Sequence, residues 1–170
     1  GFSKVYDAWW ADKRARRDID IDRENVQSFV RASTGAMLGE ESGKNFVYSP
    51  LNVYMALSML AECTDGDSRT QILSLLRENR LEDVRAQAKA LWNANYCADG
   101  AVTSVLASSV WLDDGVGYVQ KTLDTLAQDY YASSFSGEMG SDSYNKALQN
   151  WLNEQTGGLL QEQASGLEFT

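Results

Sequence analysis

The sequence predicts an α+β fold that is rich in helix and has an incomplete central β-sheet. Hydrophobic periodicity indicates about six helices but only about three strands. The longest strand candidate, residues 101–112, has no companion of comparable length elsewhere in the chain. Because backbone groups on both edges of a strand need partners, we expect either part of a sheet or a module that borrows strands.

Composition places the chain among globular proteins, with 44% hydrophobic and 11% aromatic residues. The formal net charge of −9 argues against a nucleic-acid partner, since phosphate backbones require clustered cations. No apolar run reaches about 18 residues, so neither a membrane span nor a secretory signal is expected. The chain starts with Gly1 rather than Met, which favours a processed or engineered start with any export signal lying upstream.

Residues 1–24 are expected to form an N-terminal arm of mixed character. Trp9 and Trp10 precede a basic run at residues 13–17, a combination that fits either a membrane interface or a short helix with solvated cations. We prefer the second interpretation. The first regular element is then an amphipathic helix over residues 26–38.

A central buried helix is predicted after a short strand at residues 45–48. Ser49 is suited to cap the helix, and Pro50 is suited to its first position, where the missing N–H costs nothing. Apolar residues between Leu51 and Leu60 cover nearly the whole circumference. A helix of this kind must be wrapped on all sides.

The remaining elements follow from spacing. The stretch 101–112 is rich in small residues, which makes it a poor helix and predicts one strand of about 40 Å. A brief strand is expected at residues 133–137. Apolar residues at helical spacing predict four more helices, over residues 68–76, 81–92, 118–131 and 144–155.

The stretch from Asn45 to Ile72 resembles the serpin family. Its strand, its Ser-Pro pair, its buried helix ending Ala-Leu-Ser-Met-Leu and its Gln71-Ile72 pair are similar to strand six of sheet B and helices B and C of serpins. The segment Leu148–Gly158, with Asn-Trp-Leu and Thr-Gly-Gly, resembles helix F, and residues 107–111 resemble strand two of sheet A. The sequence departs from the family pattern at Asn52, Cys63 and Ser68, where serpins usually have serine, glycine and threonine.

The resemblance covers roughly residues 25–160 and implies that residues 25–170 are the N-terminal portion of a serpin fold, the region of helices A to F. The reactive-centre loop and most sheet strands would lie beyond Thr170. The implied activity is inhibition of serine proteases, and by extension of cysteine proteases, by a suicide-substrate mechanism. A protease cleaves the loop, which then inserts into sheet A. The chain alone would be inactive, and its implied setting is extracellular or at the cell surface.

The resemblance also assigns four residues. Ser49 and Asn52 would lie at the shutter, beneath the point where sheet A opens, and Asn52 offers both a donor and an acceptor there. Leu148 and Trp151 would press helix F onto sheet A. Ordinary capping and core packing account for the same residues equally well, so both interpretations stay open.

We do not expect the chain to catalyse a reaction. Histidine is absent, so no Ser-His or Cys-His pair can form, and we predict no catalytic residue and no cofactor. The acidic residues 18–24 do not form a calcium loop, because Arg23 and Phe29 occupy the positions that need glycine and glutamate. Cys63 and Cys97 lack metal-ligand spacing, so we expect no metal site and two buried thiols. Whether they pair depends on the fold.

Two other functions remain open: a non-inhibitory serpin-like binding or carrier module, and an autonomous helical interaction domain. In the binding or carrier module the reactive loop could not insert into the sheet, so cleavage of the loop would not raise the melting temperature. We also expect the unpaired strand 101–112 to cause self-association of the chain.

Overall fold

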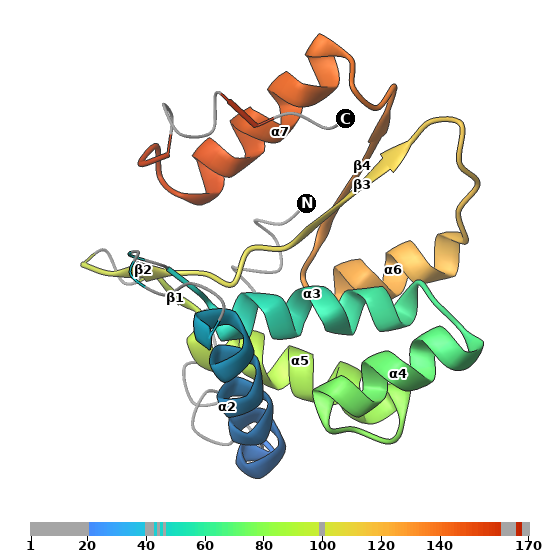
Figure 1. The fold of residues 1–170 in the computed structure, drawn as a ribbon. Coiled ribbons are helices and arrows are strands. Elements are labelled where there is room, and N and C mark those ends of the chain that lie inside the picture. Colours follow the sequence, from blue (N-terminus) through green and yellow to red (C-terminus); the bar gives the residue numbers. More distant parts are fainter. Residues whose placement is uncertain are drawn as a thin grey trace.

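The computed structural model describes residues 21–39, 43, 45, 47–98, 101–160, 166 and 167. Within these ranges the chain forms six helices and four short strands. Figure 1 shows helices α2 to α6 gathered into one body, with α7 on the other side of the β3–β4 pair. The predicted arm falls largely on residues 1–20, outside the described residues.

The helices follow the predicted segments closely. Helix α2 is Arg23–Gly39, α4 is Gly66–Leu76, α5 is Leu81–Asn95, α6 is Gln120–Asp129 and α7 is Asp142–Gln155. Each predicted helix therefore exists, with its ends within a few residues of the expectation.

Helix α3, Pro50–Glu62, begins as predicted. Ser49 is its extended N-cap, and Pro50 occupies the first turn. The expectation that α3 is wrapped on all sides is wrong, because Leu60 is 48% exposed and Ala56 is exposed too. Its buried face contains Tyr54 and Met55, both fully inaccessible, so α3 is central but uncovered along one side.

Two apolar clusters form the core. In one, Phe29 of α2 meets Tyr54 edge-on, with ring centroids 5.2 Å apart. In the other, Trp92 of α5 stacks between Tyr96 and Tyr131, at 5.0 and 4.0 Å. Leu51 and its neighbours on α3 contact both clusters, which joins them into one body.

The strands differ from the prediction in one important respect. Residues 101–112 are not one strand, because β2 (Thr103–Ser104) pairs antiparallel with β1 (Cys97–Ala98), whereas β3 (Ser109–Asp113) pairs parallel with β4 (Ser133–Gly137). The two halves thus have different partners. Between them, Leu106 turns into the helical core and is only 9% exposed. Burial of Leu106 against the helices and the change of partner interrupt the ladder.

The brief strand at residues 133–137 is confirmed as β4. The strand predicted at residues 45–48 is wrong for the described positions 45, 47 and 48, which have no regular structure. Val47 is 97% exposed. A strand requires a neighbouring strand, and the two strand pairs of the described structure, β1–β2 and β3–β4, do not include these positions.

The cysteines also differ from expectation. Cys63 and Cys97 are both free, and Cys63 is exposed while Cys97 is half-buried. The prediction of two buried thiols is therefore wrong. Cys63 is the C-cap residue of α3, directly after its last turn. Burial of part of the group, followed by the charge of Glu62, raises the pKa of the Cys63 thiol.

Candidate functional site

One face of the β3–β4 pair is covered by α7 through aromatic contacts. Trp111 of β3 stacks on Phe135, its neighbour in the parallel register, with ring centroids 4.2 Å apart. From α7, Tyr144 and Trp151 approach Trp111 edge-on, at 5.5 and 6.5 Å. Edge-to-face and offset-stacked pairs are the favoured aromatic geometries. Trp111 is therefore the point at which β3, β4 and α7 meet.

A hydrogen bond strengthens this contact. The Tyr144 hydroxyl donates to the backbone carbonyl of Leu112 at 2.8 Å. Burial raises the pKa of the Tyr144 phenol, and the Asp113 carboxylate acts in the same direction. The close approach depends on Gly137 of β4, where an added Cβ would lie 2.8 Å from Cδ2 of Tyr144. A side chain at this position would push α7 away from the strands.

Asp113 joins the ends of the two strands. Its Oδ1 accepts from the backbone N–H of Gly115 at 2.9 Å, and its Oδ2 accepts from that of Met139 at 3.1 Å. The N–H of Asp114 also donates to the carbonyl of Gly137 at 2.9 Å. These bonds hold the segment after β3 against the segment after β4, and they fix the end of the pair from which α7 starts.

Among the helices, the Glu62 carboxylate links three elements. Arg85 of α5 donates to both of its oxygens, at 2.9 and 3.0 Å, and the Tyr130 hydroxyl after α6 donates to Oε1 at 2.8 Å. The Glu62 side chain is 5% exposed, while Arg85 is 32% exposed. The hydrogen bond to Glu62 is the main cause that raises the pKa of Arg85, and burial raises that of Tyr130. A second ion pair, Lys89–Asp129 at 2.8 Å, lies beside it.

The structure places the predicted shutter residues at the N-terminal end of α3. The Ser49 hydroxyl accepts from the backbone N–H of Asn52 at 3.5 Å, and both residues are exposed. Their capping geometry is that of an ordinary helix start. Their assignment to a shutter remains a prediction.

The predicted helix F residues lie on α7, where Leu148 and Trp151 are both half-buried. Trp151 contacts Trp111 of β3, as described above. The sequence did not reveal Tyr144 as the residue bonded to β3, although it belongs to the same helical stripe. Nor did it reveal the Glu62–Arg85–Tyr130 network, whose members share no sequence pattern because they meet only when three helices pack.

Among the described residues, no three of the side chains that commonly bind metals come together. Within the same ranges, no helix combines the length and the apolar character needed to cross a bilayer. The arrangement is thus a strand pair that a helix covers on one face, held by aromatic contacts and one hydrogen bond.

Comparison with known proteins places this arrangement in a family. The family model of the serpins, described as serine protease inhibitors, matches residues 24–169. The chain therefore belongs to the serpin family, in agreement with the resemblance of residues 45–72 and 148–158. Its α+β fold is that of a partial serpin, rich in helix and with small partial sheets.

Individual relatives support this conclusion. The chain is 27% identical to a plasma serine protease inhibitor of Mus musculus over 143 residues, which are 79% of the chain and 35% of that protein. It is 23% identical to Serpin-ZX of Arabidopsis thaliana over 123 residues, 69% of the chain and 32% of the relative. The chain spans about a third of the length of the curated relatives it matches.

Solved structures share the fold. A cleaved kallistatin in complex with heparin superposes with a TM-score of 0.73 at 21% identity, covering 86% of this chain and 44% of the other. Human glycosylated kallistatin gives a TM-score of 0.70 at 22% identity, covering 79% and 38%. The chain and the kallistatins share the fold over most of the length of this chain.

Proposed function

We propose that this chain is the N-terminal portion, with the helices and the first strands, of a serpin-type inhibitor of serine proteases. Cysteine proteases are a second target class. The supporting observation is the β3–β4 pair, an incomplete parallel sheet with α7 on one face. In the described part of the chain, β3 has β4 on one edge and no strand on the other. Such an edge suits a sheet that receives further strands.

The physical basis of the proposed inhibition is strand addition. A cleaved loop that enters the sheet gains a full ladder of backbone hydrogen bonds, and this gain drives the displacement of the attached protease. In this proposal the target protease is the partner, and its own nucleophile performs the chemistry. The chain itself supplies no catalytic residue and acts as a scaffold.

In this proposal, α7 must move when the sheet takes up a further strand. It lies across β3 and β4, so a strand that enters the sheet requires α7 to yield at the Trp111, Tyr144 and Trp151 contacts. Leu148 and Trp151 would carry the packing, and Ser49 and Asn52 would serve as the shutter at the start of α3. The side chain of Asn52 is larger than the serine usual in the family, which would alter how freely the sheet opens.

The proposal also covers where the protein acts and whether the isolated chain inhibits. We propose an extracellular or cell-surface setting, supported by a relative that is named a plasma inhibitor. We also propose that the 170 residues by themselves do not inhibit, because inhibition in this scheme needs a reactive loop in addition to the scaffold described above.

A second candidate function is a non-inhibitory serpin-like carrier. A structure of human thyroxine-binding globulin with its ligand is among the similar folds, with a TM-score of 0.66 at 17% identity. A carrier would need the same scaffold without loop insertion. The two functions differ in what cleavage of the loop does to stability.

The decisive experiment uses a polypeptide that carries this chain together with its reactive loop. Incubated with trypsin, chymotrypsin, elastase or papain, it should give an SDS-resistant complex with at least one of them, and loop cleavage should raise its melting temperature. The 170-residue chain alone serves as control and should give no complex. A polypeptide that forms no complex and gains no stability on cleavage would favour the carrier and overturn the inhibitor proposal.

A further inference from the structure

The chain contains three Asp-Gly pairs, Asp65-Gly66, Asp99-Gly100 and Asp114-Gly115. Such a pair is open to a spontaneous rearrangement, because glycine has no Cβ to hinder an attack by its backbone nitrogen on the preceding side chain. Residues 99 and 100 lie outside the described residues. The other two pairs are both exposed, yet the structure holds them in different ways.

The rearrangement requires no reagent other than water. The glycine nitrogen forms a bond to Cγ of the protonated aspartate carboxyl, and its proton leaves together with the carboxyl OH as one water molecule. The product is a succinimide ring, which a water molecule then opens at one of its two carbonyl carbons. Opening at Cγ restores aspartate, whereas opening at the backbone carbon gives isoaspartate, in which the main chain runs through the former side chain.

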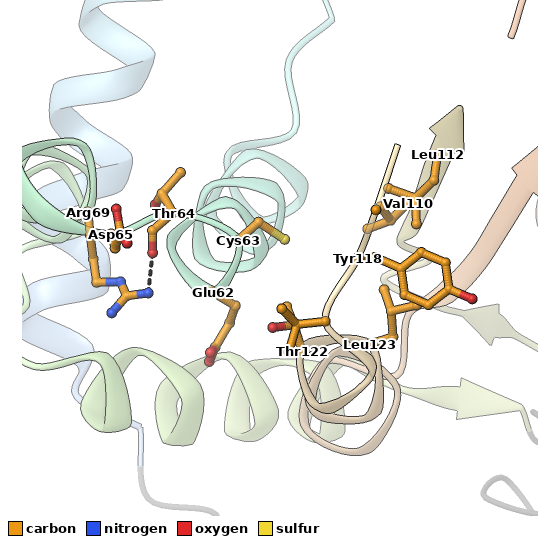
Figure 2. Close-up of a pocket in the computed structure, with 12 residues that line it drawn as sticks. Glu62, Cys63, Thr64, Asp65, Arg69, Val110, Leu112, Tyr118, Thr122 and Leu123 are labelled. Carbon is orange, nitrogen blue, oxygen red and sulfur yellow. Dashed lines mark hydrogen bonds between the residues drawn. The ribbon is translucent and has the colours of Figure 1, made fainter. Parts of the chain in front are cut away.

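Asp65 lies in the turn between α3 and α4, beside Thr64 and Arg69 (Figure 2). It is the N-cap residue of α4, but its side chain accepts no capping bond and forms no ion pair among the described residues. The Gly66 N–H belongs to the first turn of α4, where backbone donors have no partner within the helix. Within the described part of the chain it donates no hydrogen bond. The attacking nitrogen therefore has no hydrogen bond to break.

The surroundings of Gly66 leave room for the ring. An added Cβ at Gly66 would meet no atom within 4 Å, and its φ of +54° lies in the left-handed region that glycine adopts readily. The peptide unit between Asp65 and Gly66 makes one hydrogen bond within the described residues. This bond runs from the Arg69 N–H to the Asp65 carbonyl and is long, at 3.3 Å. The peptide unit is thus weakly held.

The second pair is held firmly. The Gly115 N–H donates to Oδ1 of Asp113 at 2.9 Å, and a Cβ added at Gly115 would lie only 2.9 Å from the same oxygen. Asp113 is fixed in turn by the Met139 N–H, and the Asp114 N–H donates to the Gly137 carbonyl at 2.9 Å. The nitrogen that would attack Asp114 must first leave a charged acceptor, which slows the reaction about tenfold or more.

We propose that Asp65 is a site of spontaneous isoaspartate formation in the folded chain, and that the bond from Gly115 to Asp113 protects Asp114. Isoaspartate adds one methylene to the backbone at the N-cap of α4. This displaces the carbonyl that accepts from the Arg69 N–H, so the first turn of α4 loosens. The modification is separate from protease inhibition, and the proposal does not depend on the function proposed above.

The test incubates the folded 170-residue chain for several weeks in mildly acidic water enriched in heavy oxygen. Each ring opening incorporates one heavy oxygen atom, and liquid chromatography with mass spectrometry separates peptides with isoaspartate from those with aspartate. We expect isoaspartate to form at Asp65 about tenfold faster than at Asp114. The control is the same chain unfolded in guanidinium chloride, in which the two pairs should react at similar rates because no folded structure distinguishes them.

Asp113→Ala removes the acceptor of the Gly115 N–H. It should raise the rate at Asp114 about tenfold and leave the rate at Asp65 unchanged, with folding checked by circular dichroism. Asp124→Ala, at an exposed position of α6, is the matched control and should change neither rate. If Asp113→Ala does not fold, the comparison of the folded with the unfolded parent chain still decides.

Four results would each overturn the proposal. They are equal rates at Asp65 and Asp114 in the folded chain, no isoaspartate at Asp65, the same preference for Asp65 in denaturant, and a folded Asp113→Ala variant that reacts no faster at Asp114.

Discussion

The Tyr144 hydroxyl donates a 2.8 Å hydrogen bond to the carbonyl of Leu112 and thereby ties α7 to β3. The ring of Tyr144 also lies over Gly137, where only a residue without Cβ leaves it room. One side chain thus contacts both strands of the pair. The first two predictions follow from this contact.

Tyr144→Phe should lower the free energy of unfolding by about 1 kcal/mol, because the ring stays in place while the hydrogen bond to the half-buried Leu112 carbonyl is lost. Urea unfolding followed by tryptophan fluorescence measures the change. Tyr118→Phe is the matched control, since Tyr118 is 56% exposed and should show almost no effect. Equal stabilities of the Tyr144→Phe variant and the parent chain would contradict the role of the bond.

Gly137→Ala should lower the free energy of unfolding by roughly 1–3 kcal/mol, since its Cβ would lie 2.8 Å from the Tyr144 ring. In a double-mutant cycle, Tyr144→Ala should remove most of this cost, because the clashing atoms are gone. As a control, Gly35→Ala within α2 meets no atom within 4 Å and should stabilise the chain by about 0.5–1 kcal/mol. Additive effects of the two substitutions at residues 137 and 144 would rule out this explanation.

Glu62→Gln should be strongly destabilising. The carboxylate is 5% exposed and binds Arg85 and Tyr130, so loss of its charge leaves the partly buried Arg85 guanidinium with only the more distant Asp129 carboxylate, at 3.9 Å. We expect about 2–4 kcal/mol in chemical unfolding, slightly below the value for a fully buried pair because Arg85 is 32% exposed. Glu82→Gln, whose ion pair with Arg80 is exposed, is the control and should have little effect. A cost for Glu62→Gln no larger than that of the control would show that the network contributes nothing.

Glu78 should make stability depend on pH. Burial is the main cause that raises the pKa of its carboxyl in the folded chain, against which the hydrogen bond from Asn25 acts. The folded state therefore binds this proton more tightly than the unfolded state does. As pH rises from the ordinary pKa of a glutamate through the raised folded pKa, the free energy of unfolding falls.

Glu78→Gln keeps an acceptor for Asn25 and removes the charge, so it should stabilise the chain at about pH 7 and not at about pH 4. Thermal unfolding at both values measures this difference. Glu82→Gln should change stability only slightly and with the opposite sign, because Glu82 is exposed and a hydrogen bond from its own backbone N–H lowers the pKa of its carboxyl. A Glu78→Gln variant that is no more stable than the parent at about pH 7 would disprove the prediction.

The chain should self-associate through the outer edge of β3, residues 109–113, rather than through the whole of residues 101–112 as the sequence suggested. Within the described residues, β4 occupies only one edge of this strand. Sedimentation velocity over a series of concentrations should therefore show oligomers, and the β3 amides should become more protected from hydrogen exchange as oligomers form. A monomer at every concentration would refute the prediction.

Most of the helices could be predicted from the sequence. The apolar spacing of α2 and α4 to α7, and the Ser49-Pro50 start of α3, predicted their positions, because a helix satisfies its backbone within its own segment. The motifs at residues 45–72 and 148–158 also indicated the family. Strands were less predictable, since residues 45, 47, 48 and 105–108 have strand-like composition but belong to no strand.

The sequence by itself determined the helices, the Ser49 cap of α3 and the family, all of which depend on neighbours within a few turns of the same chain. Only the tertiary structure decided where the ladder breaks at Leu106, how Tyr144 reaches Leu112 and which charges surround Glu62. These features join residues far apart in the chain, and their energies exist only when several elements pack together.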